Sequence, residues 1–318
     1  MDARELLHRP VHASDARRPL TARAFLSLWA AAISAWIDDF APSMGAALAY
    51  YTLFSLAPVL LIVIGVAGMV FGADAARGQI VSQLDGLMGH EGALAVQALL
   101  QNASQPARSV TASILGFATL LVGATSVFAE LQSDLDRVWR APAVAGRASL
   151  VALVRARILS FGMILAIGFL LLISLVISAG LAAVGKWWGP LFSGWELLLQ
   201  MANLGLSLVI ATVLFALIYK VLPRVRVAWR DVWVGAIVTS ALFTAGKFGI
   251  GLYVGRAGIG STFGAAGSLV LLMVWVYYSA QIFLLGAEFT WLFAHRHGSR
   301  ARLSGGVEPP PLRQPGDA

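Results

Sequence analysis

Six long apolar stretches, separated by segments that are alternately rich and poor in positive charge, limit most strongly how this chain folds. They cover residues 44–72, 111–133, 156–184, 198–222, 232–255 and 263–294. A helix of about 20 apolar residues crosses the roughly 30 Å hydrocarbon core of a bilayer, and every stretch reaches that length. The sequence therefore predicts an all-α, polytopic membrane protein with six transmembrane helices.

The composition agrees with a membrane protein. Hydrophobic residues make up 58% of the 318 residues and charged residues 12%, whereas a soluble domain carries about 25% charged residues. The chain has no cysteine, which excludes disulfides, thiolate metal sites and cysteine nucleophiles. Its first 24 residues are polar and rich in Arg, and no small-residue cleavage site follows them, so we expect no cleaved signal peptide.

The distribution of Lys and Arg predicts the orientation of the spans. Basic residues gather before the first span, between the second and third, around the end of the fourth, and after the sixth. The other side holds five of the 23 Lys and Arg residues: Arg77, Arg108, Lys186, Lys247 and Arg256. Cytoplasmic loops carry an excess of Lys and Arg, so both termini are predicted to be cytoplasmic. The net charge of +7 then faces anionic headgroups, and we expect no nucleic-acid partner.

The chain divides into three parts on composition. We expect a disordered cytoplasmic arm at 1–24, a six-helix transmembrane domain at 25–296 and a disordered cytoplasmic tail at 297–318. Apolar residues recur every three or four positions over 25–40, which predicts an N-terminal amphipathic helix in the membrane interface. Similar spacing within 73–110 predicts short helices on the outer face.

The entry to the first span and its centre carry unusual residues. Asp38 and Asp39 suit the positive end of a helix dipole, and Pro42 suits an early helical position. Asp39 is therefore either part of a helix cap or a contributor to an ion or substrate site. Ser55 and Pro58 lie near the middle of the span, where a proline frees a backbone carbonyl and bends the helix. Such a bend either lines a pathway or serves packing.

Polar side chains inside the apolar spans are the main functional candidates, because a charge at the bilayer centre costs about 2.5–3.5 kcal/mol on insertion scales. At about 1.5 Å of rise per residue, most of them lie towards the cytoplasmic ends of their spans. We expect these groups to converge on a polar cluster in the inner leaflet: Tyr50, Tyr51, Glu130, Gln281 and Glu288. The carboxylates either pair with a loop arginine (Arg137, Arg140, Arg224 or Arg226), or line a vestibule for a cation, a proton or a polar headgroup.

Lys247 is separate from this cluster, because it lies roughly 12 Å below the outer end of the fifth span. It either extends outward to the interface, pairs with an acidic residue such as Glu196 or Asp74, or lines a wet cavity. Gly251 and Gly255 follow at GxxxG spacing, which allows close approach of helices.

No motif for catalysis is present in the sequence. The chain contains no P-loop, no HExxH and no GxSxG. Its five histidines lie in tails or loops without metal-ligand companions. We therefore expect no enzymatic activity, no cofactor and no metal.

Four segments resemble the YihY/BrkB family of bacterial inner-membrane proteins, whose members were formerly labelled ribonuclease BN. They are DFAPSMGAALAYYTLFSLAPVL from Asp39, ELQSDLDRVWR from Glu130, LPRVRVAWRDVWVG from Leu222 and FGAAGSLVLLMVWVYYSAQIFLLGAEFT from Phe263. The resemblance covers about residues 25–295 in the expected order. It implies a multi-pass protein of the bacterial cytoplasmic (inner) membrane. Some family members are called virulence or serum-resistance factors, and others are linked to envelope lipid handling.

We therefore expect a transporter-like protein that handles a lipid or another amphipathic envelope solute. The candidate pathway or cavity residues are Asp39, Tyr50, Tyr51, Ser55, Pro58, Glu130, Lys247, Gln281 and Glu288. The alternative is a non-transporting scaffold, which anchors an envelope or lipid-transfer partner through 73–110. Membrane lipids are the expected partners, and the Gly-rich helix faces permit a homo-oligomer.

Overall fold

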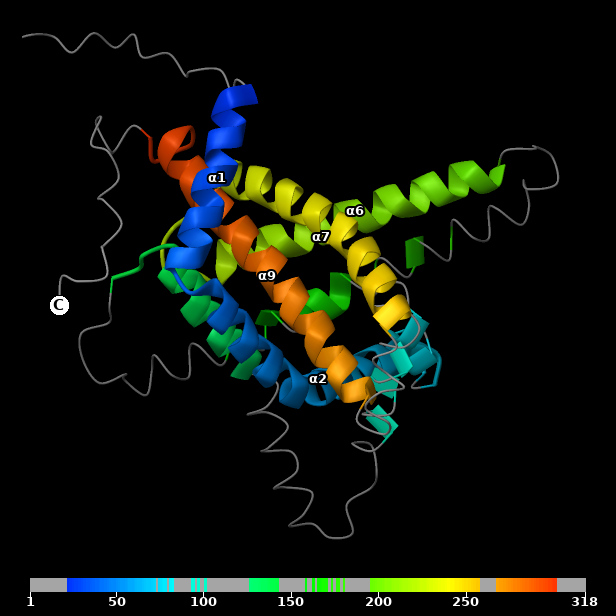
Figure 1. The fold of residues 1–318 in the computed structure, drawn as a ribbon. Coiled ribbons are helices and arrows are strands. Elements are labelled where there is room, and N and C mark those ends of the chain that lie inside the picture. Colours follow the sequence, from blue (N-terminus) through cyan, green and yellow to red (C-terminus); the bar gives the residue numbers. More distant parts are fainter. Residues whose placement is uncertain are drawn as a thin grey trace, which may run out of the picture.

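The computed structural model describes residues 22–72, 126–142, 195–257 and 267–301 without interruption, and parts of 74–101 and 158–180. Regular structure in these residues is helical, and Figure 1 shows the labelled helices. They are α1 (Ala22–Asp38), α2 (Ala41–Phe71), α6 (Trp195–Val221), α7 (Trp229–Ala257) and α9 (Gly267–Arg296). The prediction of an all-helical protein is confirmed for the described part of the chain.

Helix α9 lies at the centre of the described bundle. It runs through the middle of the view in Figure 1 and packs against α1, α2 and α7, while α6 packs against α7. Leu284 and Ala287 of α9 are fully buried. A further helical segment at 126–138 adds Leu135 and Val138 to the same core. Side chains of α9 therefore face several neighbouring helices.

Three described helices are long and apolar enough to cross a membrane, namely Met201–Val221, Trp229–Ile250 and Leu269–Arg296. They correspond to the predicted fourth, fifth and sixth spans. A fourth candidate is the pair Ala24–Asp38 and Ala41–Leu56, which is bent by 66° at its junction. Most of the predicted spans 111–133 and 156–184 lies outside the described residues, as do most of the two tails. The count of six spans therefore stays a prediction.

The corner between α1 and α2 is built around Phe40. This residue is the N-cap of α2 and adopts a left-handed conformation, with φ 58° and ψ 37°. No side chain caps the helix, so the interpretation of Asp39 as a capping residue is wrong, whereas Pro42 does lie in the first turn. A bulky residue in this region is strained, and surrounding packing has to hold it there. Part of this packing holds α1 against α9, where the centroids of the Trp29 and Phe289 rings lie 5.0 Å apart.

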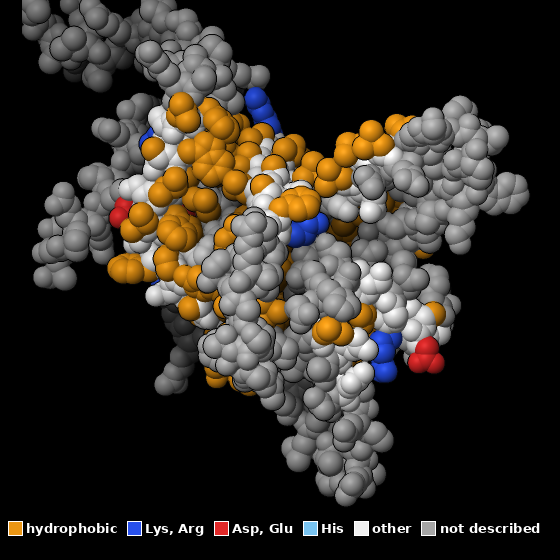
Figure 2. Space-filling view, turned by 45° about the vertical axis from the view of Figure 1, so that its right-hand side comes forward, with side chains coloured by type: hydrophobic (Ala, Val, Ile, Leu, Met, Phe, Trp, Pro, Cys, Tyr) orange, Lys and Arg blue, Asp and Glu red, His pale blue; other side chains and the backbone are white. Residues whose placement is uncertain are grey.

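The other face of α1 is apolar and exposed. Leu26, Ile33 and Ile37 are 67%, 47% and 58% exposed, while Leu28 and Ala32 are fully buried. Figure 2 shows that hydrophobic side chains cover much of the described surface on the side of the molecule in view. Exposed apolar surface of this extent is expected where lipid, rather than water, surrounds the protein.

Helices α7 and α9 cross closely because small residues face each other. A side chain on Gly235 would overlap Thr290, and one on Gly286 would overlap Thr239 and the Tyr219 hydroxyl. Both threonine hydroxyls turn back onto their own helices: Thr290 Oγ1 donates to the Gly286 carbonyl at 2.6 Å, and Thr239 Oγ1 to the Gly235 carbonyl at 2.8 Å. The crossing thus buries hydroxyl groups without leaving them unpaired.

A turn at residues 297–301, within the segment predicted to be a tail, closes the end of the bundle. Asp231 in the first turn of α7 is fully buried. It accepts hydrogen bonds from the backbone N–H of Ser299 at 3.2 Å and from the Ser299 hydroxyl at 2.5 Å. Arg300 donates to the Arg226 carbonyl at 3.1 Å. These contacts hold the segment after α9 against the start of α7.

The α7–α9 crossing gives a first testable prediction. Gly286→Ala places a methyl group into Thr239 and Tyr219, and overpacking of this kind costs about 1–3 kcal/mol. Gly205→Ala in α6 is the matched control, because a Cβ there meets open space and alanine favours a helix over glycine by up to about 1 kcal/mol. Unfolding in bilayer nanodiscs should show Gly286→Ala destabilised and Gly205→Ala equal to or above wild type. Equal stability of the two variants would contradict the close crossing.

Candidate functional site

The most unusual buried group is the carboxyl of Glu288 in α9. The side chain is 1% exposed, and neither of its carboxylate oxygens has a hydrogen-bond partner among the described residues. Removing an ionised carboxylate from water costs several kcal/mol unless it is paired and hydrogen-bonded. Glu288 therefore needs either a proton or a partner from outside the protein.

Two charged residues from other elements act on Glu288. Asp39 reaches it from the α1–α2 corner, and Arg140 from the end of the 126–138 helix. The Arg140 guanidinium carbon also lies 4.1 Å from the centroid of the Trp291 ring, which fixes it by a cation–π contact. Sequence analysis identified the two acids and included Arg140 among the loop arginines available to pair with the glutamates.

The backbone around this contact is strained. The non-glycine residues with positive φ in the described chain are Phe40, at 58°, and Arg140, at 51°. One directly follows Asp39, and the other is the base that acts on Glu288. Strained backbone conformations gather at functional sites, where surrounding structure maintains them.

Gln281 is a second polar residue of α9 with buried, unpartnered side-chain atoms. It lies two turns before Glu288 on the same helix face, about 10 Å away along the axis. Its side chain packs against Gly45 of α2, where a Cβ would overlap the amide nitrogen, and neither amide atom has a hydrogen-bond partner in the described structure. Trp36 Nε1 and Asp39 Oδ2 also lack partners there. We refer to Trp36, Asp39, Arg140, Gln281 and Glu288 as the polar seam.

The predicted residues on α2 lie in different surroundings. Tyr50 and Tyr51 are 54% and 38% exposed, and the Tyr50 ring packs edge-on against Tyr51 and Phe54. Ser55 is buried, and its hydroxyl donates to the Thr52 carbonyl at 3.3 Å. Pro58 lies within the helix, but its side chain is outside the described residues. The structure thus brings Asp39 and Glu288 together, while the two tyrosines lie on an exposed surface.

Glu130 and Lys247 are also placed apart from the seam contacts described above. Glu130 lies one helical turn before Asp134 and acts on that carboxyl. Lys247 in α7 is half-buried, with its ammonium 5.6 Å from the centroid of the Phe248 ring. Their roles as pathway residues stay predictions. Among the residues that the structure describes, no group of three or more His, Cys, Asp or Glu is arranged to hold a metal.

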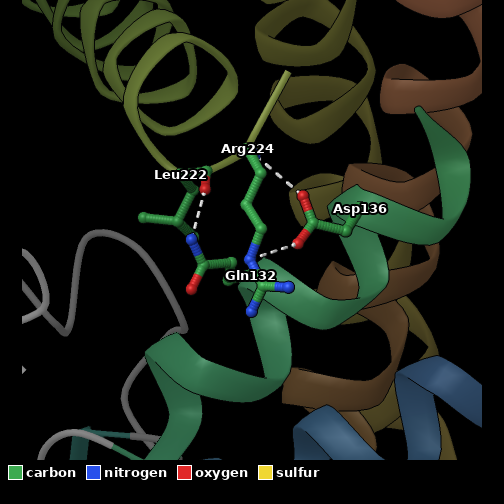
Figure 3. Close-up of polar contacts among 4 residues, drawn as sticks. All are labelled: Gln132, Asp136, Leu222 and Arg224. Carbon is green, nitrogen blue, oxygen red and sulfur yellow. Dashed lines mark hydrogen bonds and ion pairs between the residues drawn. The ribbon is translucent and has the colours of Figure 1, made fainter. Parts of the chain in front are cut away.

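A loop arginine does pair with an acid, but the acid is Asp136, which sequence analysis did not single out. Asp136 accepts a hydrogen bond from the Arg224 backbone N–H at 2.8 Å and lies 3.2 Å from its guanidinium Nε (Figure 3). Beside it, Gln132 donates to the Leu222 carbonyl at 2.8 Å. Burial raises the pKa of Asp136, and the two contacts with Arg224 oppose that rise. The i, i+4 spacing of Gln132 and Asp136 is the sequence signal that marks this face.

The contacts between Asp136 and Arg224 predict that substituting the two residues changes the free energy of unfolding by different amounts. Arg224→Ala keeps the backbone N–H that Asp136 binds and removes only a half-exposed ion pair, which is worth about 0–1 kcal/mol. Asp136→Ala leaves both donors without an acceptor, which costs about 1–3 kcal/mol. Unfolding measured side by side should show the larger loss for Asp136→Ala. A larger loss for Arg224→Ala would contradict the assignment.

Asp134 lies one residue beyond the predicted second span and is 4% exposed, with Oδ2 unpartnered among described residues. Burial, and then the Glu130 charge, raise its pKa from 3.8 to about 7, against the effect of Arg137. Between about pH 4 and pH 7 the folded chain therefore keeps a proton that the unfolded chain has released. The associated stability is complete below this window and is lost as pH rises through it.

Asp134→Asn should remove this pH dependence. We expect the variant to match wild type near pH 4 and to exceed it at pH 8 by at least about 1.4 kcal/mol, the equivalent of one pKa unit. Chemical unfolding at both pH values measures the difference. An unchanged slope between them would show that Asp134 is not the titrating group.

The sequence is similar to a family of bacterial membrane proteins. A profile of the family described as "Virulence factor BrkB" matches residues 32–309. A UPF0761 membrane protein of Stenotrophomonas maltophilia is 27% identical over 264 residues, which cover 80% of this chain and 58% of that protein. UPF0761 membrane protein YihY of Escherichia fergusonii is 34% identical over 189 residues, which cover 58% of this chain and 60% of the relative. The chain thus spans 58–60% of the length of these relatives. No solved structure matches it.

Proposed function

Because this chain belongs to the BrkB family of membrane proteins, we propose that it is an inner-membrane, transporter-like protein that handles a lipid or another amphipathic envelope solute. The observation that carries the proposal is the polar seam. Six side-chain atoms of Trp36, Asp39, Gln281 and Glu288 are buried without described protein partners. Trp36 and Gln281 obtain their hydrogen bonds from water or from a bound solute, and the carboxyls of Asp39 and Glu288 from these or from a proton.

The composition of the seam favours a solute with a polar head. The seam offers carboxylate and amide oxygens as acceptors, and indole and amide N–H groups as donors. Tyr50, Tyr51 and Phe54 of α2 expose their rings about 120–180° around that helix from Gly45, against which Gln281 packs. The seam matches the polar head of such a solute, whereas the exposed rings of α2 lie on a different face of that helix. A bundle needed only for packing gains stability from apolar residues at the same positions.

We also propose six crossings with both termini in the cytoplasm. The contacts described above support this orientation, because they bring three basic segments, 137–140, 224–230 and 296–300, to one end of the bundle. Arg224 binds Asp136, Arg300 binds the Arg226 carbonyl, and the Arg300 guanidinium lies 5.2 Å from the Trp139 ring centroid. Cytoplasmic ends of membrane proteins gather basic residues in this way.

The scaffold alternative depends on residues 73–110, which are described only in part. Ile80, Val96 and Leu100 of this segment are buried in the main core, so these apolar side chains are used within the protein. No described feature of the segment favours a docking role over this internal one. The proposal therefore assigns the function to the seam, without a catalytic step, a cofactor or a nucleic-acid partner.

Retention of a specific solute tests the proposal. We expect native mass spectrometry of wild-type protein, extracted with its surrounding bilayer, to show one lipid or lipid precursor enriched over bulk phospholipid. Glu288→Gln and Gln281→Leu should lose that enrichment at least tenfold while the folded protein still accumulates in the membrane. Asp38→Asn is the matched control, since Asp38 is exposed beside Asp39, and it should retain the solute. Bulk phospholipid alone on wild type would overturn the proposal.

A further inference from the structure

The contact between Asp39 and Glu288 lacks a hydrogen-bond donor only while both groups are ionised. A carboxylate accepts hydrogen bonds and donates none, so two facing carboxylates leave each other unsatisfied. The two side chains are placed to share a hydrogen bond, which forms only when one of them carries a proton. Both Glu288 oxygens are unpartnered in the described structure when the proton is left out. One shared proton therefore supplies the missing hydrogen bond between the two carboxyls without any movement of the chain.

The charge of the contact leads to the same conclusion. The charged groups that act on Glu288 from the described elements are Asp39 at the α1–α2 corner and Arg140 after the 126–138 helix. With both acids ionised the three groups carry a net charge of −1, and with one proton they are neutral. Two like charges held together in a buried site do not both ionise readily. Glu288 is 1% exposed, so water does not screen this charge.

A proton also fits this contact better than a metal ion. Calcium takes six to eight oxygen ligands and magnesium six, in defined geometry. Among described residues the contact offers two carboxyl groups, and no larger group of ligating side chains is arranged around a common point. Gln281 lies about 10 Å further along the helix and does not complete such a site.

We propose that Asp39 and Glu288 form a proton-binding site, in which one proton is shared between the two carboxyls across the α1–α9 contact. Release of the proton leaves two carboxylates that repel each other and lack a donor. Since Asp39 precedes the strained Phe40, this repulsion acts on the bend between α1 and α2. In the proposed transporter this proton is the ion whose binding is coupled to movement of the solute. Only that coupling rests on the proposed function; proton binding itself does not.

Infrared spectroscopy of the protein in lipid nanodiscs, titrated with acid and base, tests proton binding without any solute. In an Asp134→Asn background, which lacks the band of Asp134, the protein should show the carbonyl band of a protonated carboxylic acid at pH 7, and Glu288→Gln should remove it. In Asp39→Asn the like charge is gone, so the midpoint of the Glu288 band should fall by at least one pH unit, a tenfold change in proton affinity. Asp38→Asn, the exposed neighbour, should leave both band and midpoint unchanged. Asp134→Asn identifies the separate band of Asp134.

Persistence of the band in Glu288→Gln, or an unshifted midpoint in Asp39→Asn, would overturn the proton site. If Glu288→Gln does not fold, the midpoint in Asp39→Asn decides the question. A midpoint that falls in proportion to added sodium or magnesium would assign the contact to a metal cation and would equally overturn it. Wild type that shows the band but retains only bulk phospholipid would contradict the proposed function and leave the proton site standing.

Discussion

The close packing of α9 against three other helices determines where the polar side chains of α9 lie. On one side, Gly235 and Gly286 bring α7 and α9 together, and threonine hydroxyls bond back to their own helices. On the other side, Phe289 meets the aromatic face of α1. This arrangement fixes the rotation of α9, and with it the direction of Gln281 and Glu288 towards α2 and the α1–α2 corner.

The same bundle treats buried polar groups in two ways. Tyr219 donates to the Phe283 carbonyl at 2.7 Å, and Thr212 lies 2.7 Å from the Ser240 hydroxyl, so these groups are satisfied within the protein. Gln281 and Glu288 are not satisfied by described residues. Because satisfied groups serve packing at little cost, the unsatisfied ones mark the part of α9 that packing alone does not explain. This difference is the physical basis for placing function at the seam.

Much of the architecture could be predicted from the sequence, because span length and hydropathy are local properties. They located α2, α6, α7 and α9 and put Gln281 and Glu288 in the same predicted span. The contact between Asp39 and Glu288 depends on a 66° bend at a phenylalanine with positive φ, and phenylalanine carries no sequence signal for that conformation. The loop arginine was correctly expected to pair with an acid, but helix rotation presents Asp136 to it.

The free energy of unfolding of Glu288→Met in a bilayer tests most directly whether Glu288 is retained for function rather than for stability. Methionine removes the buried carboxyl and keeps a side chain of similar length. The account predicts a stability within about 1 kcal/mol of wild type or above it, because methionine removes the cost of burying a carboxyl that has no described hydrogen-bond partner. A loss of about 3–5 kcal/mol, typical of breaking a structural ion pair, would contradict it.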